Sequence, residues 1–468
     1  MGAILCIILA VCIYAIKIVH NSNNLTFDKW CEIFISFFIF TNCFNFGFSY
    51  FSLGNQYIDG ALGMNLRLEV FMIITPIFFI VLSQRKKWNF LPIPWYVVFA
   101  IALFCAVNIF NPNNLAVGST IVGILQVLLY IVFLYIVCSS VSIEVIMRGI
   151  YEGFVYTIIL QSALTLCYPI LGIKEVTLLF REGVSIRAEE RPGAPGTFSH
   201  PNALGGYVSL ILAFFWSCIL YGYQRRKSIV CALLATFVLI FTFSRSALLA
   251  SIFAVAMVYL IYNTRNGSIF TVKNIFYRII PIIILAVALI FLTPIKDSFI
   301  GSNVDEMFIA RLMHFYCAYE AIIEHPFIGV GFNAHLEYIR SNVNPSIFAM
   351  FDKTVWNPEE FMFSNPVHNI FLIFLTEFGF IGFMPILYFI IRKFANIKKQ
   401  LRRETSVEYH ICAIFAIGIL CYLMVHGMSD WVPLTPRMRN IWLLIFFIVA
   451  CAEHKTEQKD TNKKALPH

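Results

Sequence analysis

The stretch Ser364-Asn-Pro-Val-His-Asn-Ile-Phe-Leu-Ile-Phe-Leu-Thr-Glu-Phe-Gly-Phe-Ile-Gly382 decides how the rest of the chain is interpreted. It begins as a polar turn broken by Pro366, and within two residues it enters an apolar run that reaches Ile391. A membrane helix that starts in this way holds His368 and Asn369 at the boundary between water and lipid. An imidazole with one side in a dry protein interior and the other near solvent suits a proton acceptor. His368 is therefore a candidate general base.

Glycines and one acid lie further along the same apolar run. Nine residues separate Asn369 from Gly379, and Gly382 follows about one helical turn later. Glycines at this spacing predict that a neighbouring helix approaches closely. Glu377 is the clearest ionisable group deep inside the proposed span.

The composition places this stretch in a membrane protein. Of the 468 residues, 59% are hydrophobic and 13% are charged, whereas ordinary soluble domains carry about 25% charged residues. Because one span needs about 20 apolar residues, the apolar runs allow about twelve to thirteen transmembrane helices. We predict an all-α, polytopic, single integral membrane domain over residues 1–468. The thirteen cysteines lie nearly all in apolar runs, which favours neither a disulfide framework nor a CxxC metal site.

The expected spans follow from the apolar runs. They cover approximately 3–19, 31–52, 68–84, 93–111, 118–140, 146–172, 201–223, 228–243, 245–263, 276–294, 367–391, 409–427 and 439–452.

Lys and Arg indicate which loops face the cytoplasm. The basic clusters fall on alternate loops, at 85–87, 225–227, 265–278, 392–403 and in the C-terminal tail. This pattern accounts for the net charge of +8 without a nucleic-acid partner. The opposite face then receives 173–200, the turn at 244–246, the loop 295–366 and residues 428–438. We predict that 295–366 is one large non-cytoplasmic loop.

One segment of that loop, Glu306 to Glu324, predicts an amphipathic helix. Its apolar stripe at period 3.6 consists of Phe308, Leu312, Phe315, Tyr319 and Ile322. Arg311 lies to the side of the stripe, from which it could reach a charged partner at the membrane surface. His325-Pro326 ends the helix, and Gly329-Val-Gly331 supplies a flexible connection.

Four elements assigned to the outer face could carry chemistry, and each has a structural alternative. The segment from Arg191 to Asn202 also fits a loop that ends in a helix start, because Pro and Gly punctuate loops and Ser or Asn caps helices. Arg245 also fits an arginine that extends to lipid headgroups, and Arg311 a solvated residue. His368 also fits an interfacial hydrogen-bonding residue.

Taken together, the elements favour a site for a lipid-linked phosphate or pyrophosphate. Guanidinium groups bind phosphate oxygens in bidentate fashion and stay charged at any relevant pH. An interfacial histidine beside them could move a group off that phosphate. The histidines His200, His314, His325 and His335 show no metal-ligand spacing such as HExxH, and the nucleotide motifs GxxxxGK[ST] and GxGxxG are absent. We expect no metal and no cofactor.

Over residues 190–390 the sequence resembles the O-antigen ligase and O-antigen polymerase superfamily of bacterial membrane glycosyltransferases. His368-Asn369, nine residues, and Gly379-Phe-Ile-Gly382 look like the ligase signature, with Glu377 in its usual place. The segment Gly193 to Asn202 is similar to a family segment that ends in Phe-x-x-Pro-Asn, which here supplies Pro201 and Asn202. Arg311 through Gly331 resembles the arginine-led helix with its Pro-x-x-Gly-x-Gly turn, and Phe-Ser-Arg-Ser at 243–246 matches the Ser-Arg turn.

The resemblance implies a C-type glycosyltransferase fold with a large external loop over a lipid-facing cleft. It implies an inverting transfer, without metal, of a glycan from undecaprenyl diphosphate to a glycan or lipid acceptor. Arg245 and Arg311 would hold the pyrophosphate, with Arg191 as a third arginine, and His368 would deprotonate the acceptor hydroxyl. Asn369, Glu377, Gly379, Gly382, Pro201 and Asn202 would support this site. The resemblance also implies that the protein lies in the bacterial cytoplasmic membrane, where it contacts membrane lipid. The active site would be on the external or periplasmic face.

The acceptor stays open at this point. It could be lipid A core, a protein, or another lipid-linked repeat unit, and the last would make the chain a polymerase of O-antigen, capsule or exopolysaccharide. A polysaccharide flippase or exporter is a further alternative. The dominant loop 295–366 argues against transport, and a transporter is expected to show unwound or charged helix centres.

Overall fold

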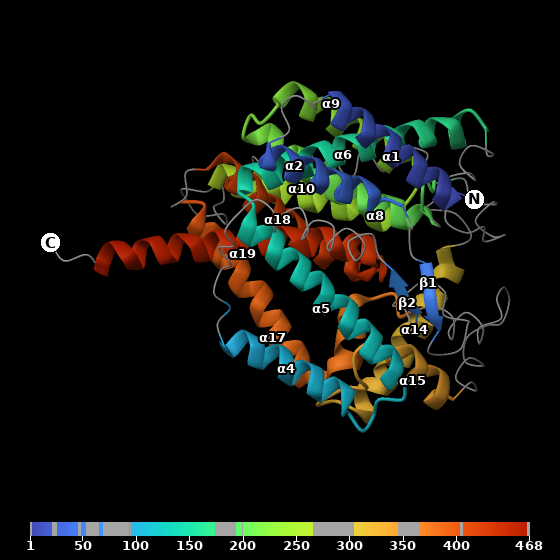
Figure 1. Ribbon diagram of the computed structural model, residues 1–468. Helices are drawn as coiled ribbons and strands as arrows, with labels where there is room; N and C mark the ends of the chain where they lie inside the picture. The colour runs from blue at the N-terminus through green and yellow to red at the C-terminus, as the bar shows by residue number, and fades with distance from the viewer. Residues whose placement is uncertain are drawn as a thin grey trace.

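The computed structural model describes residues 2–20, 26–44, 48–52, 65–68, 93, 95–173, 193–198, 200–264, 304–344, 366–402 and 406–465. Helices dominate this part of the chain (Figure 1). Those of the first part are α1 (Gly2–His20), α2 (Phe27–Thr41), α4 (Trp95–Ile109), α5 (Val117–Ser140), α6 (Ile143–Thr165) and its π-helical continuation η2 (Leu166–Ile170). The rest are α8 (Pro201–Leu220), α9 (Arg225–Phe241), α10 (Arg245–Thr264), α14 (Val304–Glu324), α15 (His335–Asn342), α17 (Ile370–Gln400), α18 (Val407–Gly427), the 3-10 turn η6 (Val432–Leu434) and α19 (Pro436–Ala465).

The prediction of an all-α, multi-pass membrane protein is confirmed. Within the described ranges, six helical segments are long and apolar enough to cross a bilayer: Val117–Ser140, Ile143–Tyr168, Pro201–Leu220, Arg245–Asn263, Ile370–Ile397 and Val407–Gly427. The predicted spans 3–19, 93–111 and 228–243 also coincide with helices, α1, α4 and α9. The predicted span 276–294 lies outside the described residues, as does 68–84 apart from Leu68.

The predicted helical span 31–52 is wrong in its second half. Helix α2 ends at Thr41, and strand β1 (Phe48–Ser52) pairs antiparallel with β2 (Asn65–Leu68). Asn42 caps the end of α2, and its side-chain amide donates to the Arg437 carbonyl at 2.6 Å, which ties the end of this helix to α19. The segment Phe-Ser-Tyr-Phe-Ser contains three aromatic residues, a residue type that is enriched in strands.

A bundle of α2, α6, α8, α9, α10 and α18 encloses the main apolar core. Helix α18 runs through its middle, and Ile414, Phe415 and Ile417 are fully buried. The rings of Phe154, Phe214 and Phe415 meet edge to face, with centroids 5.0 to 6.4 Å apart. Such contacts between large aromatic side chains fix the relative positions of α6, α8 and α18.

The crossing of α2 and α6 depends on two glycines one helical turn apart. A Cβ atom at Gly149 would lie 2.7 Å from Cβ of Ile35, and one at Gly153 would lie 2.6 Å from Cβ of Ile39. The motif Gly149-Ile-Tyr-Glu-Gly153 therefore lets the two helices approach more closely than any larger residue would allow.

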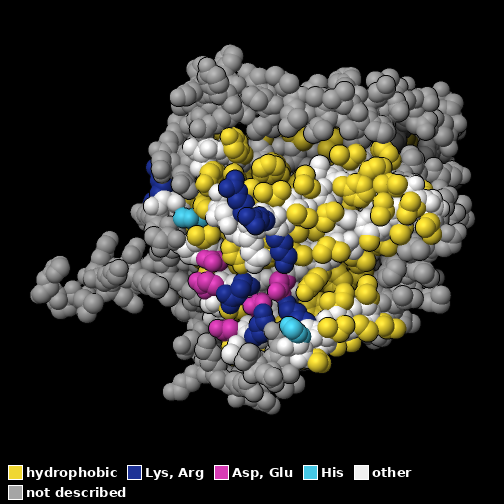
Figure 2. Space-filling view, turned by 90° about the horizontal axis from the view of Figure 1, so that it is seen from above, with side chains coloured by type: hydrophobic (Ala, Val, Ile, Leu, Met, Phe, Trp, Pro, Cys, Tyr) yellow, Lys and Arg dark blue, Asp and Glu magenta, His cyan; other side chains and the backbone are white. Residues whose placement is uncertain are grey.

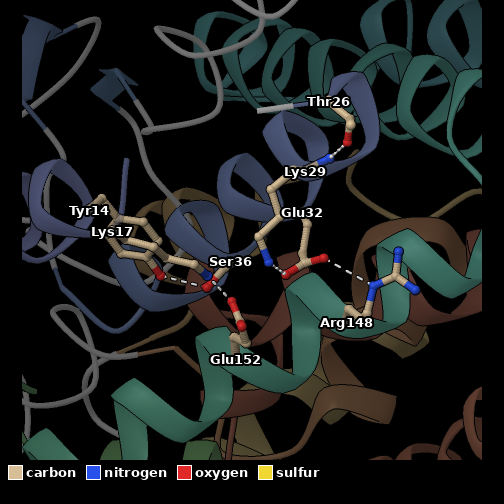
Figure 3. A network of polar contacts seen from close by, with 8 residues as sticks. All are labelled: Tyr14, Lys17, Thr26, Lys29, Glu32, Ser36, Arg148 and Glu152. Atoms are coloured by element: carbon tan, nitrogen blue, oxygen red, sulfur yellow. Dashed lines mark hydrogen bonds and ion pairs between the residues drawn. The ribbon is translucent and has the colours of Figure 1, made fainter. Parts of the chain in front are cut away.

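The two ends of the bundle differ in chemistry. At one end, here called the basic end, Glu32 of α2 contacts Lys29 at 2.5 Å and Arg148 of α6 at 3.0 Å, and Lys17 of α1 pairs with Glu152 (Figure 3). The space-filling view shows Lys and Arg gathered with Asp and Glu in one part of the described surface, beside a broad hydrophobic area (Figure 2). A charged zone that borders an apolar surface is typical of a membrane–water boundary.

At the other end, here called the site end, α14, α15 and the first half of α17 form a smaller layer. It lies below the bundle in Figure 1, next to α4. A second apolar cluster joins this layer to η6 through buried residues that include Met313, Cys317, Ile370 and Leu434.

The amphipathic helix predicted at 306–324 is confirmed by α14, but its buried face is different from the one expected. Met313, Cys317 and Ala321 are buried, whereas Leu312 and Tyr319 of the predicted apolar stripe are exposed. In a membrane protein, large apolar side chains can face lipid while smaller ones face protein, so apolar periodicity alone does not identify the buried side.

Candidate active site

The predicted motif at 193–202 ends in the start of α8. His200 is the N-cap residue, and its Nδ1 atom accepts a hydrogen bond from the backbone N–H of Asn202 at 3.0 Å, while Pro201 occupies the first turn. The side-chain amide of Asn202 donates to Oδ2 of Asp430 at 3.3 Å. The motif therefore supplies a helix cap and also joins α8 to the loop that follows α18.

The beginning of the same motif passes directly under the turn between α9 and α10. The N–H of Ala194 donates to the Phe241 carbonyl at 2.8 Å, and a Cβ atom at Gly193 would lie 2.4 Å from the Thr242 carbonyl oxygen. Arg245 is the first residue of α10 and is half-buried at this end. Arg191 lies outside the described residues, so its role stays a prediction.

Asn369 begins α17, as the sequence predicts for a helix start at this position. Its side-chain oxygen accepts hydrogen bonds from the N–H groups of Phe371 at 2.9 Å and Leu372 at 3.1 Å. Its amide nitrogen donates to the Met428 carbonyl at 3.2 Å. Asn369 therefore fixes the start of α17 against the loop after α18, and this places His368 beside that loop.

His368 meets a second histidine. Its Nδ1 atom lies 2.8 Å from Nδ1 of His314 on α14, with ring centroids 4.7 Å apart and ring planes 18° from parallel. His314 is 1% exposed, whereas His368 is half-buried. The accessible ring of the pair is thus His368.

Two charges and one backbone carbonyl act on His368. Burial lowers the pKa of His368, the Asp430 carboxylate opposes this shift, the Arg311 charge adds to it, and the Pro366 carbonyl opposes it, so that the pKa of His368 lies below its usual value. Burial by itself raises the pKa of Asp430, but the charges of His368 and His426 outweigh it and hold this pKa below its usual value. A neutral imidazole therefore faces an ionised carboxylate at neutral pH.

The two predicted arginines are linked electrostatically, and one of them also acts on this imidazole. Arg311 lies one turn before His314 on α14, and its charge acts on His368. The charges of Arg311 and Arg245 also act on each other. The arrangement therefore provides a positively charged place for an anion next to a neutral base.

The predicted glycine pair has a different partner from the one expected. Gly379 has φ +58° and breaks the regular path of α17, and a Cβ atom there would lie 2.4 Å from the backbone of Phe327. The approaching element is thus the turn 326–331, not a neighbouring helix. A Cβ atom at Gly382 would lie 2.6 Å from Cβ of Phe378 within α17 itself. The left-handed φ at Gly379 is readily adopted only by glycine.

Four backbone hydrogen bonds join this turn to the kink. Val330 and Gly331 donate to the carbonyls of Thr376 and Glu377, each at 2.9 Å, and Phe380 and Ile381 donate to the carbonyls of Pro326 and Phe327 at 2.8 and 3.0 Å. The break in α17 removes the helical partners of these groups, and the turn replaces them. The Pro-x-x-Gly-x-Gly and Gly-x-x-Gly motifs are therefore two halves of one backbone joint.

Glu377 also has a side-chain partner. Its Oε1 atom lies 2.7 Å from Nδ1 of His335, the first residue of α15, and both side chains are buried. The predicted intramembrane acid is thus paired in a dry environment and links α15 to α17.

An asparagine-rich loop between α4 and α5 encloses the other side of the turn. The side-chain amide of Asn111 donates to the carbonyls of Ile328 and Gly329 at 3.3 and 3.1 Å, and that of Asn113 donates to Gly329 at 3.2 Å. Asn108 accepts from the N–H of Phe332 at 2.8 Å. Side-chain amides therefore satisfy the turn where no secondary structure does.

Sequence reasoning missed several of these residues. The sequence gives His314 no metal-ligand spacing, but its place one turn after Arg311, on the same helix face, is a signal that could have identified it. Asp430 lies in the short segment 428–438 that the charge rule assigns to the same face as His368. This shared face is the sequence signal that could have identified Asp430 as a site residue. Asn111 lies in the first 170 residues, where only hydropathy matched any pattern.

Of the comparisons with known proteins, the one with protein-family models agrees with the motifs. A comparison with curated protein sequences gives no significant match. A family model described as O-antigen ligase matches residues 230–387, about a third of the chain, within the region whose motifs resemble that family. This stretch includes Arg245, Arg311, His368 and the backbone joint at Gly379. The match confirms the resemblance and supports membership of this multi-pass membrane protein in the O-antigen ligase family.

Proposed function

We propose that the protein transfers a glycan from undecaprenyl diphosphate to an acceptor hydroxyl at the external face of the bacterial cytoplasmic membrane. The observation that carries this proposal is the neutral imidazole of His368 within reach of the Arg311 charge, which also acts on Arg245. Membership in the O-antigen ligase family supports glycan transfer in a membrane. The donor, the acceptor and the roles of the residues are our inference.

The two arginines bind the pyrophosphate of the donor. The positive charges of the two guanidinium groups act on each other, and a diphosphate that both groups bind would attract each of them. Negative charge grows on the diphosphate as the bond to the sugar breaks. Contacts to Arg245 and Arg311 therefore strengthen in the transition state, which accelerates the reaction. Arg191 is the proposed third contact, and its position lies outside the described residues.

His368 removes the proton of the acceptor hydroxyl. The hydroxyl oxygen forms a bond to the anomeric carbon from the side opposite the diphosphate, and the bond from that carbon to the diphosphate oxygen breaks. Undecaprenyl diphosphate leaves as the anion, and the configuration at the anomeric carbon inverts. The Asp430 carboxylate stabilises the imidazolium that forms, because its charge favours the protonated ring. The proton of His368 then returns to solvent.

Purified protein with an undecaprenyl-diphosphate glycan tests the proposal directly. We expect released undecaprenyl diphosphate, an acceptor-linked glycan of inverted configuration, and no loss of rate in EDTA. Lipid A core, a protein and a second lipid-linked repeat are supplied in separate reactions. Elongation of the lipid-linked repeat alone would assign the protein as a polymerase. If none of these acceptors yields released carrier, glycan transfer from this donor is contradicted.

The variant His368→Ala tests the proposed base. At saturating acceptor we expect turnover to fall about 100- to 10,000-fold, the usual contribution of general base catalysis. The matched control is His410→Ala, because His410 lies at the basic end, where its ring meets that of Tyr221. A native rate for His368→Ala at high acceptor concentration would show that His368 only binds substrate.

The proposed side of the membrane has its own test. Asn342 on α15 and Arg226 on α9 are both exposed, and they lie on the two sides that the charge rule separates. Cysteines introduced at these two positions, in a background without the native cysteines, should react with an impermeant reagent from opposite sides of the membrane. Labelling of both from outside intact cells contradicts the proposed topology.

A further inference from the structure

The asparagine-rich loop between α4 and α5 has its polar side chains inside and its apolar side chains outside. Asn108, Asn111 and Asn114 are buried, whereas Phe110 and Leu115 are 81% and 51% exposed. Buried polar side chains and large exposed apolar ones are the informative departures from the usual distribution in a protein in water. This loop shows both departures within eight residues. Such an arrangement suits a surface that contacts lipid.

The turn 326–331, which this loop encloses, has its carbonyls satisfied within the protein. All four carbonyls of residues 326–329 accept a hydrogen bond from a protein donor: two from N–H groups of α17 and two from the side chain of Asn111. Irregular backbone at membrane depth requires such partners, because the hydrocarbon offers none. The side chain of Phe327, in the same turn, is 68% exposed. The bonding and the outer surface of the turn therefore both suit dry surroundings.

Helix α17 gives the depth of this turn in the membrane. Beyond the kink at Gly379, the twelve residues from Phe380 to Ile391 lead to the basic cluster that begins at Arg392. They span about 18 Å at about 1.5 Å per residue, whereas the hydrocarbon core is about 30 Å thick. The exposed large apolar side chains of this half of α17 are Phe380, Ile381, Met384, Tyr388, Phe389 and Ile391. With the basic cluster at the cytoplasmic boundary, the kink lies roughly 10 Å below the outer edge of the hydrocarbon core.

The outward side of α14 continues this apolar surface. Leu312, Tyr319 and Ile323 are 44%, 55% and 57% exposed, and their spacing of seven and four residues places them on one side of the helix. The charged residues at the borders of this stripe are Arg311, Glu320 and Glu324. The stripe leads to the turn 326–331, which is joined by backbone hydrogen bonds to the exposed half of α17. An apolar stripe with charged borders is typical of a helix in the membrane interface.

We propose that the turn 326–331 is a re-entrant element, which lies with the loop 110–115 and the apolar side of α14 in the outer leaflet, in contact with the acyl chains of membrane lipid. Continuity with the exposed half of α17 identifies lipid as the occupant, because the span Ile370–Ile397 is apolar and long enough to cross the bilayer. Part of the segment 295–366 is thus seated in the membrane.

This depth has a consequence for Arg311. Because Arg311 lies at the border of the stripe, its long side chain reaches the level of the lipid phosphates when the stripe contacts acyl chains. A pyrophosphate anchored in the membrane would then meet Arg311 without leaving the headgroup layer. This consequence rests on the proposed function, whereas the depth of the turn does not.

Spin labels on single introduced cysteines measure this depth without any substrate. Ile323→Cys and Phe327→Cys test the proposed surface. Met384→Cys, on the exposed half of α17, is the control for acyl chains, and Asn342→Cys, on the exposed side of α15, is the control for water. Each variant is made in the background without the native cysteines and is reconstituted in lipid bilayers. Oxygen concentrates among acyl chains and a water-soluble nickel complex is excluded from them, so the ratio of the two collision rates reports depth.

We expect the oxygen-to-nickel ratio of Ile323→Cys and Phe327→Cys to approach that of Met384→Cys and to exceed that of Asn342→Cys several-fold. A ratio equal to that of Asn342→Cys would show that this surface lies in water and would overturn the inference. Exclusion of both reagents would show that another part of the chain or a second copy covers the surface, and this result would also overturn it.

A second measurement keeps the native cysteines. Phe327→Trp and Asn342→Trp are reconstituted in lipid with brominated acyl chains, and the fluorescence that each adds to that of the native protein is compared. We expect bromine to quench the added fluorescence of Phe327→Trp and to leave that of Asn342→Trp nearly unchanged. Equal quenching in the two variants contradicts the inference. Failure of the protein to transfer a glycan would instead contradict the proposed function and would leave both depth measurements unchanged.

Discussion

The crossing of α2 and α6 and the joint between α17 and the turn 326–331 both bring backbone segments into close contact, but by different means. The crossing is made by apolar side chains around Gly149 and Gly153 within continuous helices. The joint is made by four backbone hydrogen bonds at a broken helix. Apolar packing tolerates small shifts, whereas a hydrogen-bonded joint requires each donor and acceptor to stay in register. The joint can therefore hold a reacting group in place more firmly than the crossing.

The largest effect is expected from breaking this joint. Gly379→Ala places a Cβ atom 2.4 Å from the Phe327 backbone at φ +58°, so the turn must move away. Loss of four hydrogen bonds together with backbone strain costs roughly 3 to 6 kcal/mol. We expect loss of transfer activity and a lower thermal midpoint in detergent, measured by the fraction of protein that stays monodisperse after heating.

The matched control is Gly222→Ala in the turn before α9. Gly222 has φ +72°, but among the described residues no atom beyond those of Gly222 and its two chain neighbours lies within 4 Å of the place of its Cβ. This variant tests strain without the clash, and about 1 to 2 kcal/mol is expected. Equal losses of stability in the two variants would show that the contact of Gly379 with Phe327 does not contribute to stability.

The second-largest effect is expected from changes to the two arginines of the site end, Arg311 and Arg245. Lysine keeps the charge of arginine but loses its planar, bidentate fork. We expect Arg311→Lys and Arg245→Lys to express and fold normally and to lose about 10- to 100-fold in kcat/KM for the donor, since one good bidentate contact is worth a few kcal/mol. Arg148→Lys at the basic end, where a partner carboxylate is already present, should leave transfer unchanged.

Full activity in both variants, Arg311→Lys and Arg245→Lys, would contradict the proposal that these arginines bind the pyrophosphate of the donor. An equal loss in Arg148→Lys would show that the effect is on folding.

The two regions also differ in how well the sequence predicts them. Hydropathy and basic clusters predict the bundle, because lipid imposes the same requirement on every span. The motifs predict that Arg311, Arg245 and His368 act together, and in the structure the Arg311 charge acts on both Arg245 and His368, while their joint action stays a prediction. The end of α2 at Thr41 was not predictable from hydropathy, because a tertiary hydrogen bond from Asn42 contributes to it.

The contacts of the joint could also not be predicted from the sequence. Asn111 and Gly329 are 218 positions apart, and nothing in their local sequence indicates that they meet. Likewise, the sequence around Gly379 is compatible with a site of helix packing and with a kink. Only the segment that packs against Gly379 distinguishes the two. Residue type shows that a polar or small group is needed, whereas the fold determines which group it meets.

A third, smaller effect is expected in the asparagine-rich loop. Asn111→Ala removes the side-chain donor of the Ile328 carbonyl and leaves the Gly329 carbonyl with only that of Asn113, and a buried unsatisfied group costs about 1 to 3 kcal/mol. We expect a lower thermal midpoint and a few-fold loss of transfer. Asn263→Ala is the control, because Asn263 is exposed and bonds only within its own helix at 2.8 Å in the contacts described. If the two variants are equally stable, the loop does not support the joint.

The smallest effect is a change in pH dependence. His368 is active as a base when unprotonated, so transfer is lost as pH falls through its pKa, which lies below its usual value of about 6.5. The Asp430 carboxylate raises the pKa of His368, and Asp430→Asn removes this charge while it keeps the shape that contacts Asn202. We expect the acid limb of the kcat profile to move down by about one pH unit. Glu144→Gln, an exposed carboxylate at the basic end, should leave the limb in place. An acid limb that stays fixed or moves upward in Asp430→Asn would show that Asp430 does not act on the group that titrates, and the comparison between the two ends would then rest on the backbone joint alone.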